Sequence, residues 1–143
     1  MKRGRGQYKV ENMHWLLYNE VICLEGKTIG LRNSELLIII PAFNESGNIE
    51  KTIKMIEEHT PEFDYVIIND CSTDHTLEIC RNNNFNVIDL PINLGIGGAV
   101  QTGYQYAVKN GYQYAVQVDG DGQHNPEFIR KMLQVLQEKN VNM

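Results

Sequence analysis

Two aspartates one residue apart, Asp119 and Asp121, lie on a glycine-rich turn after the apolar alternating run 116–118. Carboxylates at the end of a buried strand suit a divalent cation that carries phosphates. Mg2+ or Mn2+ takes one or two carboxylates and leaves its other positions to phosphate and water. Asp and Gly also favour turns for their own reasons. Asp-Gly-Asp-Gly alone therefore leaves open a metal site or a plain acidic turn.

Two other polar segments follow predicted strands. Residues 41–45, Pro-Ala-Phe-Asn-Glu, offer an aromatic face and a carboxylate that could stack on a base and accept a hydrogen bond from a base or ribose. Asp70, within residues 69–74, could accept the ring N–H of uracil or guanine. Taken alone, each segment is better explained as a strand end followed by a helix cap.

A third segment, residues 93–99, is glycine-rich and enters a helix, so its backbone N–H groups could meet a phosphate. It follows the third strand and lacks the full Gly-x-Gly-x-x-Gly pattern, which weakens a dinucleotide-binding interpretation. Close packing of the helix on the sheet explains Gly97 and Gly98 better. His124 is a candidate metal-shell or phosphate-binding group, although a histidine in a turn is more often simply hydrogen-bonded.

The elements that position these residues alternate from residue 35 onward. Strands are predicted at 36–40, 65–68, 86–89 and 112–118, and a helix follows each. This order predicts an α/β fold with a mostly parallel sheet flanked by helices. Such sheets bind ligands at the carboxyl ends of their strands. Residues 41–45, 69–74 and 119–123 should therefore gather along one rim.

Helix starts and apolar faces can also be predicted. Asn44 or Ser46 is expected to cap the first helix, and Ser72, Thr73 and Asp74 resemble capping residues for the second. The last helix should begin with Asn125 as cap and Pro126 at the first position. The predicted apolar stripes are Ile49, Ile53 and Ile56; Leu77, Ile79 and Cys80; and Phe128, Met132, Leu133 and Leu136.

Length and composition narrow the class of protein. The 143 residues suffice for one domain, and a net charge of -5 argues against a nucleic-acid-binding surface. The three cysteines form no Cys-x-x-Cys pair and predict a reducing, cytoplasmic location. Residues 1–34 differ in composition from the rest and form an extension for which a short helix or a hairpin over 21–31 is expected. The longest apolar run, 36–40, is too short to span a membrane.

Taken together, segments 41–45, 69–74, 93–99 and 119–127 resemble family 2 glycosyltransferases of the GT-A fold, particularly the dolichyl-phosphate mannose synthase-like branch. The resemblance implies a Rossmann-like nucleotide-binding half that binds a UDP- or GDP-linked sugar with Mg2+ or Mn2+. It assigns nucleotide-sugar binding to Pro41, Ala42, Phe43, Glu45, Asp70, Gly97, Asp119 and Gly120. It assigns the metal to Asp119 and Asp121, the DxD motif, and to Gln123.

Two departures from the family pattern bear on function. Asn69 stands where the family often has a first aspartate. The chain also ends one helix after the DxD motif, which predicts a truncated, donor-binding half with little transfer activity of its own. The intact enzyme is expected to transfer a sugar with inversion to a hydroxyl or a polyprenyl phosphate, with a catalytic base outside this chain. Self-association through an exposed sheet edge, and membrane association of the full-length form at the cytoplasmic face, are further expectations.

Two alternatives of other classes remain open at this point. The first is a non-catalytic nucleotide-sensing or scaffold domain, which would bind a nucleotide without using its sugar. The second is a dinucleotide-binding oxidoreductase built around residues 93–99, which would bind NAD without a metal. The position of that loop after the third strand already weakens the second alternative.

Overall fold

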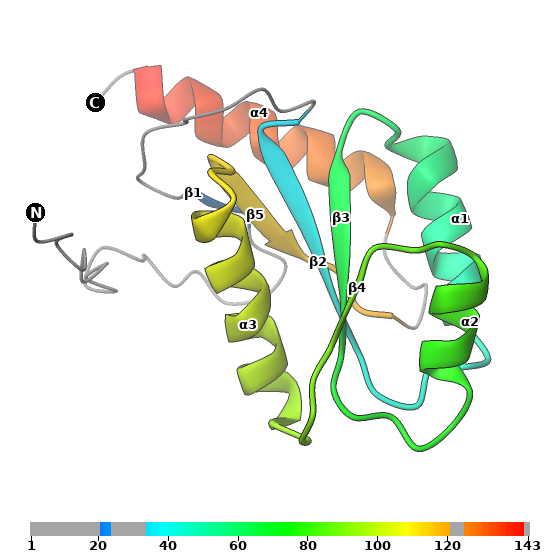
Figure 1. Cartoon of the computed structure of the whole chain (residues 1–143). Helices are drawn as coiled ribbons and strands as arrows, with labels where there is room; N and C mark the ends of the chain where they lie inside the picture. Colours follow the sequence, from blue (N-terminus) through cyan, green and yellow to red (C-terminus); the bar gives the residue numbers. More distant parts are fainter. Residues whose placement is uncertain (1–20, 24–33, 121–124, 142–143) are drawn as a thin grey trace, which may run out of the picture.

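The computed structural model describes residues 21–23, 34–120 and 125–141. Their elements form one sheet with helices on both faces (Figure 1). The strands are β1 (Val21–Cys23), β2 (Leu36–Ala42), β3 (Asp64–Asn69), β4 (Val87–Asp89) and β5 (Tyr114–Gln117). The helices are α1 (Ile49–His59), α2 (Thr76–Asn82), α3 (Gly95–Lys109) and α4 (Pro126–Val141). The predicted alternation of strands and helices is confirmed, and strand bounds differ from the prediction by a few residues.

The sheet has the order β1-β5-β2-β3-β4. Strands β5, β2, β3 and β4 are parallel to their neighbours, with Ala42 opposite Asn69 and Asn69 opposite Asp89. The predicted mostly parallel sheet is therefore confirmed. Strand β1 pairs antiparallel with β5, so that β5 is not an open edge over 114–116. A short strand from the N-terminal extension, which the sequence did not identify, thus lies beside the last predicted strand.

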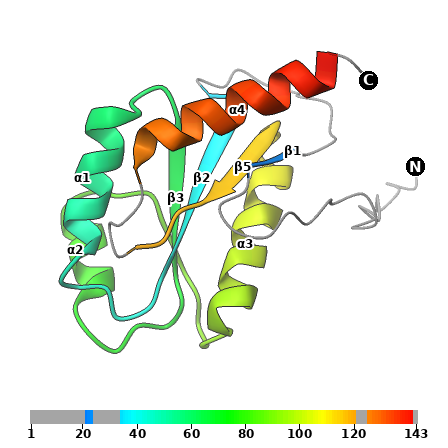
Figure 2. The ribbon, with the colours of Figure 1, turned by 180° about the vertical axis from the view of Figure 1, so that it is seen from behind.

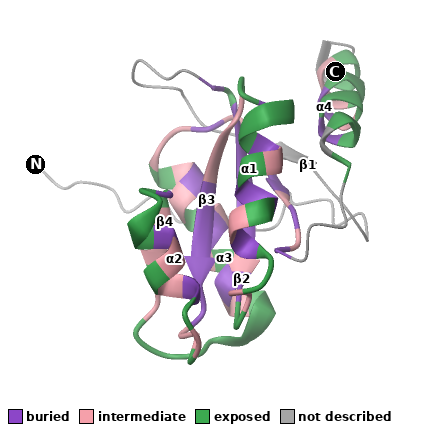
Figure 3. Cartoon of the chain, turned by 90° about the vertical axis from the view of Figure 1, so that its right-hand side faces the viewer, coloured by how far each residue is buried: buried purple, intermediate pink, exposed green. Residues whose placement is uncertain are grey.

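Strand β2 is central and buried from both sides, which explains its unbroken apolar sequence. Leu36, Ile38 and Ile40 belong to one core cluster, and Leu37 and Ile39 belong to the other. This alternation is the period of two that a strand imposes on its side chains. Figure 3 shows the neighbouring strand β3 as mostly buried as well.

Helices α1, α2 and α4 cover one face of the sheet, whereas α3 covers the other (Figure 2). The predicted stripe of Ile49, Ile53 and Ile56 on α1 is fully buried. Gly103, rather than Gly97 or Gly98, brings α3 against the sheet, since a Cβ at Gly103 would lie 2.3 Å from Ile39 Cγ2. A Cβ at Gly97 would meet nothing within 4 Å, and the atoms nearest to one at Gly98 belong to Leu94, not to the sheet. The predicted packing role of Gly97 and Gly98 is therefore wrong.

Helix α4 begins as predicted, because Pro126 is its first residue and Asn125 Oδ1 accepts the N–H of Glu127 at 3.0 Å. Its buried face differs from the prediction. Ile129 is 4% exposed and packs with Leu133, while Phe128 is 52% exposed. The predicted stripe contained Phe128 in place of Ile129, so it was offset by one position at its start. The Arg130 guanidinium bonds the Glu62 carboxylate, lowers its pKa, and ties α4 to the segment between α1 and β3.

The N-terminal extension is described only at β1, so the predicted helix and hairpin there lie largely outside the described residues. Over the described ranges, no helix combines the length and the apolar character that crossing a bilayer requires.

Candidate functional site

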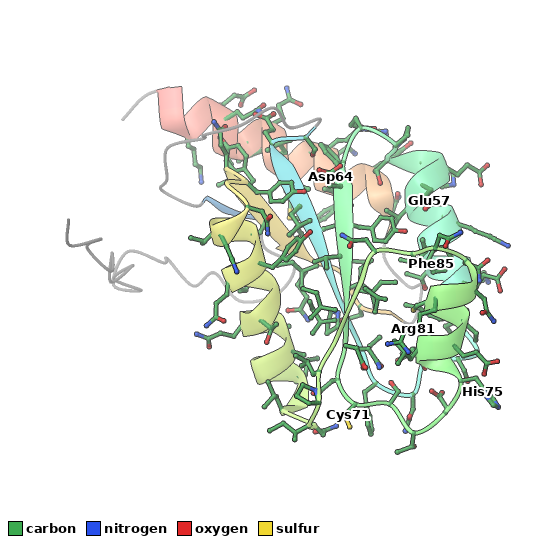
Figure 4. All side chains as sticks on the ribbon, viewed as in Figure 1. Glu57, Asp64, Cys71, His75, Arg81 and Phe85 are labelled. Atoms are coloured by element: carbon green, nitrogen blue, oxygen red, sulfur yellow. The ribbon has the colours of Figure 1, made fainter. Side chains whose placement is uncertain are left out.

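The polar segments that follow β2, β3 and β5 meet at one rim, as predicted. The backbone N–H of Asp70 donates to Ala42 O at 2.9 Å, which joins the first two segments. A Cβ built at Gly120 would lie 3.4 Å from Pro41 O and from Glu45 Cγ, which places the third segment beside the first. In Figure 4 this end of the sheet lies at the bottom, where Cys71 marks the segment after β3.

The loop after β2 is bound to the loop before α2 through three consecutive backbone amides. Asn44 N–H donates to Ser72 Oγ at 3.0 Å, Glu45 N–H to Thr76 Oγ1 at 2.9 Å, and Ser46 N–H to Asp74 Oδ2 at 3.1 Å. These amides are therefore already used inside the protein. A phosphate at this rim has to be held by other groups.

The predicted caps of α1, Asn44 and Ser46, are wrong. The helix begins at Ile49, and its N-cap residue is Asn48, which makes no side-chain capping bond. Instead, Glu45 O accepts the N–H groups of Asn48 and Ile49 at 3.0 and 2.8 Å. Tertiary hydrogen bonds across the rim engage residues 44–46 and outweigh their local capping preference.

The N-cap residue of α2 is His75, which makes no side-chain capping bond, so none of the predicted caps Ser72, Thr73 and Asp74 takes the N-cap position. Asp74, one residue before it, still bonds the first turn of the helix. Its Oδ1 accepts the N–H of Thr76, the first residue of the helix, at 3.0 Å. Desolvation raises the pKa of Asp74, but hydrogen bonds from Thr76 and Ser46 outweigh it and lower the pKa to about 2. The carboxylate is therefore ionised, and able to hold both loops, at any ordinary pH.

Asp70 is 3% exposed and is bound to the glycine-rich segment. Its Oδ1 accepts the N–H of Leu94 at 2.7 Å, and its backbone oxygen accepts from Asn93 Nδ2 at 3.1 Å. Asn93 Oδ1 in turn accepts the N–H of Gly95 at 3.1 Å. The first amides of this segment thus bond to protein oxygens, which disfavours an interpretation in which they cradle the diphosphate of NAD.

Asn69 is buried and connects two neighbouring strand ends. Its Nδ2 donates to Asp89 Oδ1 at 2.9 Å, and its Oδ1 accepts from Ser72 Oγ at 2.6 Å. An aspartate at this position would turn a carboxylate toward Asp89. The departure from the expected family pattern at this position therefore has a local reason, the acidic residue at the end of β4.

The turn after β5 is held by a residue that the sequence did not single out. Thr52 on α1 is fully buried, and its Oγ1 donates to Gly120 O at 3.0 Å. Asp119 is half-buried, and its Oδ1 accepts from Gln117 Nε2 at 3.2 Å. Gly120 is buried beside Glu45, so the Glu45 side chain lies next to the predicted DxD turn. A polar Thr on the otherwise apolar stripe of α1 is the only sequence signal for this contact.

The remaining predicted site residues differ in accessibility. Phe43 is 48% exposed, so its ring is available to a planar ligand. Pro41 is half-buried, Ala42 is buried, and Gly97 is exposed. Asp121, Gln123 and His124 lie outside the described residues. Within residues 21–23, 34–120 and 125–141, no three acidic, histidine or cysteine side chains gather closely enough to hold a metal ion.

Comparison with known proteins gives a family and several relatives. The model of glycosyl transferase family 2 matches residues 37–143. The undecaprenyl-phosphate mannosyltransferase of Micrococcus luteus is 28% identical over 106 residues, which cover 71% of this chain and 44% of that protein. The chain spans less than half the length of the curated relatives it matches.

Two solved structures share the fold. TarS of S. aureus in complex with UDP has a TM-score of 0.59 and 27% identity, over 72% of this chain and 32% of TarS. The mannosyltransferase PcManGT from Pyrobaculum calidifontis, in complex with GDP-Man and Mn2+, has a TM-score of 0.53 over 61% of this chain and 27% of that one. At 21% identity, the second likeness concerns the fold alone.

Proposed function

The chain belongs to glycosyl transferase family 2, and we propose that its rim is the donor site of a glycosyltransferase. The site binds a nucleoside diphosphate sugar together with a divalent cation. The observation that carries this proposal is the meeting of the 41–45 loop, with Glu45, and the Asp119–Gly120 turn at the carboxyl ends of parallel strands. Ligand sites of α/β sheets form at this edge.

In this proposal, Asp119, Asp121 and Gln123 are the residues that would hold the metal ion. The described part of this set fits a hard cation, because Asp119 supplies a carboxylate at a strand end and Thr52 fixes the adjoining Gly120. The amides of residues 44–46 are engaged within the protein, which supports a cation as the group that holds the diphosphate. When bound, the cation neutralises the charge that the leaving diphosphate gathers.

The nucleoside occupies the other side of the rim. The exposed ring of Phe43 stacks on the base, and Pro41 and Ala42 line the same segment. Asp70 uses Oδ1 to hold Leu94, so Oδ2 is the atom that accepts the base N–H. Glu45 accepts from the ribose, and Gly97 leaves open space beside the entry to α3.

The proposal extends to the acceptor and the mechanism of the whole protein, and the name of one relative supports the acceptor. The enzyme transfers the sugar with inversion, and its acceptor is a polyprenyl phosphate, as the name of the Micrococcus luteus relative indicates for that protein. A lipid phosphate is already an anion and attacks without a general base, whereas a hydroxyl acceptor needs one. If the acceptor is a hydroxyl, we propose that the catalytic base lies outside the 143 residues of this chain.

The test is thermal unfolding with UDP, GDP, their sugar conjugates and NAD, each with Mn2+ and with EDTA. One nucleotide should raise the melting temperature by several degrees in Mn2+ only, since a ligand at about 100 times its dissociation constant contributes roughly 2.7 kcal/mol. Asp121→Ala should abolish the shift. Glu58→Ala, which removes an exposed carboxylate on α1, is the matched control and should retain it.

Two outcomes would overturn the proposal. A shift with NAD in EDTA would favour the dinucleotide-binding alternative. If a nucleotide raises the melting temperature in EDTA as well, and does so in Asp121→Ala, the donor site binds the nucleotide without a metal. Sugar transfer itself would be measured on a polypeptide that spans the full length of the curated relatives.

A further inference from the structure

We propose that Asn44 is a positioning residue of the donor site, whose side chain locks the loop after β2 onto the loop before α2. The inference rests on the proposed function, since it concerns how Phe43 and Glu45 are presented to the nucleotide. Asn44 lies between these two residues in the sequence but is not itself assigned a ligand contact.

The Asn44 side chain is the acceptor for three groups of the opposite loop. Its Oδ1 accepts the N–H of Thr73 at 2.8 Å, the N–H of Asp74 at 3.3 Å and the hydroxyl of Thr73 at 3.3 Å. A single amide oxygen thereby binds two consecutive backbone amides. This contact spans 29 residues of sequence and joins the segments that follow β2 and β3.

The segment at the start of α2 also accepts hydrogen bonds from the loop after β2. It accepts the backbone N–H groups of residues 44, 45 and 46 through Ser72, Thr76 and Asp74, so the two loops bind each other in both directions. The residues on either side of Asn44 are therefore fixed relative to β3. Fixing them before the ligand arrives removes an ordering cost that binding would otherwise include.

The backbone at Asn44 explains why this residue type is suited to the position. Its φ is 54°, in the left-handed region that Asn tolerates better than most non-glycine residues. Glycine would adopt this φ but would lose the acceptor oxygen. Asn84 offers a matched control, because its φ is 55° and it lies on an exposed turn after α2.

The experiment combines amide hydrogen exchange with nucleotide titration in Mn2+ on wild type, Asn44→Gly, Asn44→Asp and Asn84→Gly. In Asn44→Gly, exchange at the Thr73 and Asp74 amides should accelerate at least about tenfold, the effect of losing 1.4 kcal/mol of protection. The dissociation constant for the nucleotide should rise by about the same factor. Asn44→Asp keeps an acceptor oxygen and should restore the exchange protection, and Asn84→Gly should change neither quantity.

Amide exchange and nucleotide titration together distinguish a failure of the Asn44 inference from a failure of the proposed donor site. Unchanged exchange at Thr73 and Asp74 in folded Asn44→Gly would overturn the inference whether or not a nucleotide binds. Unchanged nucleotide affinity in that variant would also overturn it and would leave the donor site intact. Failure of the wild-type protein to bind any nucleotide would instead contradict the proposed function. If Asn44→Gly does not fold, Ser72→Ala removes a separate hydrogen bond between the same two segments, the one that the Asn44 backbone N–H donates to Ser72 Oγ, and unchanged nucleotide affinity in that variant would count against the need to fix the loop after β2.

Discussion

At the scale of single residues, the site is built from polar side chains that bind other parts of the protein first. Asn69 bonds Asp89 and Ser72, and Asp70 bonds Leu94. Each is nearly or fully buried, where an unpaired polar group would be costly. Their identities therefore depend on their partners as much as on any ligand.

The Asn69–Asp89 pair gives a test at this scale. In Asn69→Asp, a carboxylate would face the Asp89 carboxylate across the present 2.9 Å contact. We expect a loss of about 1 to 3 kcal/mol in the free energy of unfolding, because a buried donor is lost and like charges meet. Adding Asp89→Asn restores a donor opposite an acceptor and should recover most of the loss. Urea unfolding of both single variants and the double variant would measure the coupling, and purely additive losses would contradict the pairing.

Residue-level predictions from the sequence succeeded where the signal was local. Asn125 caps α4, and Pro126 is the first residue of that helix, as its sequence predicts. The cap predicted at Asn44 is wrong, and the role of Thr52 was not predicted; the partners of these two residues are 29 and 68 residues away. A capping preference can be read from neighbours in sequence, whereas these contacts depend on the completed sheet.

At the scale of elements, α3 shows how the sheet selects a helix face. Its buried positions are small, Ala99, Gly103 and Ala107, at a spacing of four. This spacing puts all three on one side of the helix, so that the backbone approaches β2 closely. The helix entry, which is held by Asp70 and Asn93, is thereby fixed at the rim.

Gly103→Ala should destabilise the protein, and Gly97→Ala should not. The added Cβ at residue 103 would overlap the fully buried Ile39 side chain, and overpacking of this kind costs about 1 to 3 kcal/mol. At Gly97 the same change meets open space and should contribute up to about 1 kcal/mol through helix propensity. Because both glycines belong to α3, chemical denaturation of the two variants isolates the packing effect. Equal stabilities would contradict the close approach of α3 to β2.

Element types were predictable even where local sequence is ambiguous. The hexapeptide Gly-Tyr-Gln-Tyr-Ala-Val occurs at 103–108 within α3 and again at 111–116, where it leads into β5. Flanking apolar residues at helical spacing identify the first copy, and alternation into Val118 identifies the second. Strand β1 could not be assigned in the same way, since three residues carry no period and their pairing with β5 is tertiary.

At the scale of the whole molecule, a parallel sheet brings segments from across the chain to one edge. The rule that ligands bind at the carboxyl ends of strands led to the prediction that these segments lie together. The contacts of Ala42, Asp70 and Gly120 confirm that the segments meet. The rule gives no information on how the loops hold one another. That information resides in side-chain hydrogen bonds across the rim, which form only once the strands are in register.

The measurement that most directly tests the donor site is paramagnetic broadening of backbone amide signals by Mn2+, with and without the nucleoside diphosphate that stabilises the protein. We expect the signals of Glu45 and Gly120 to be lost only when Mn2+ and nucleotide are both present, and to return in Asp121→Ala. This result would place the cation and the diphosphate together at the rim, between the two loops. Broadening that needs no nucleotide, or that centres on the exposed carboxylates of α1 such as Glu58, would contradict a metal-bridged donor site.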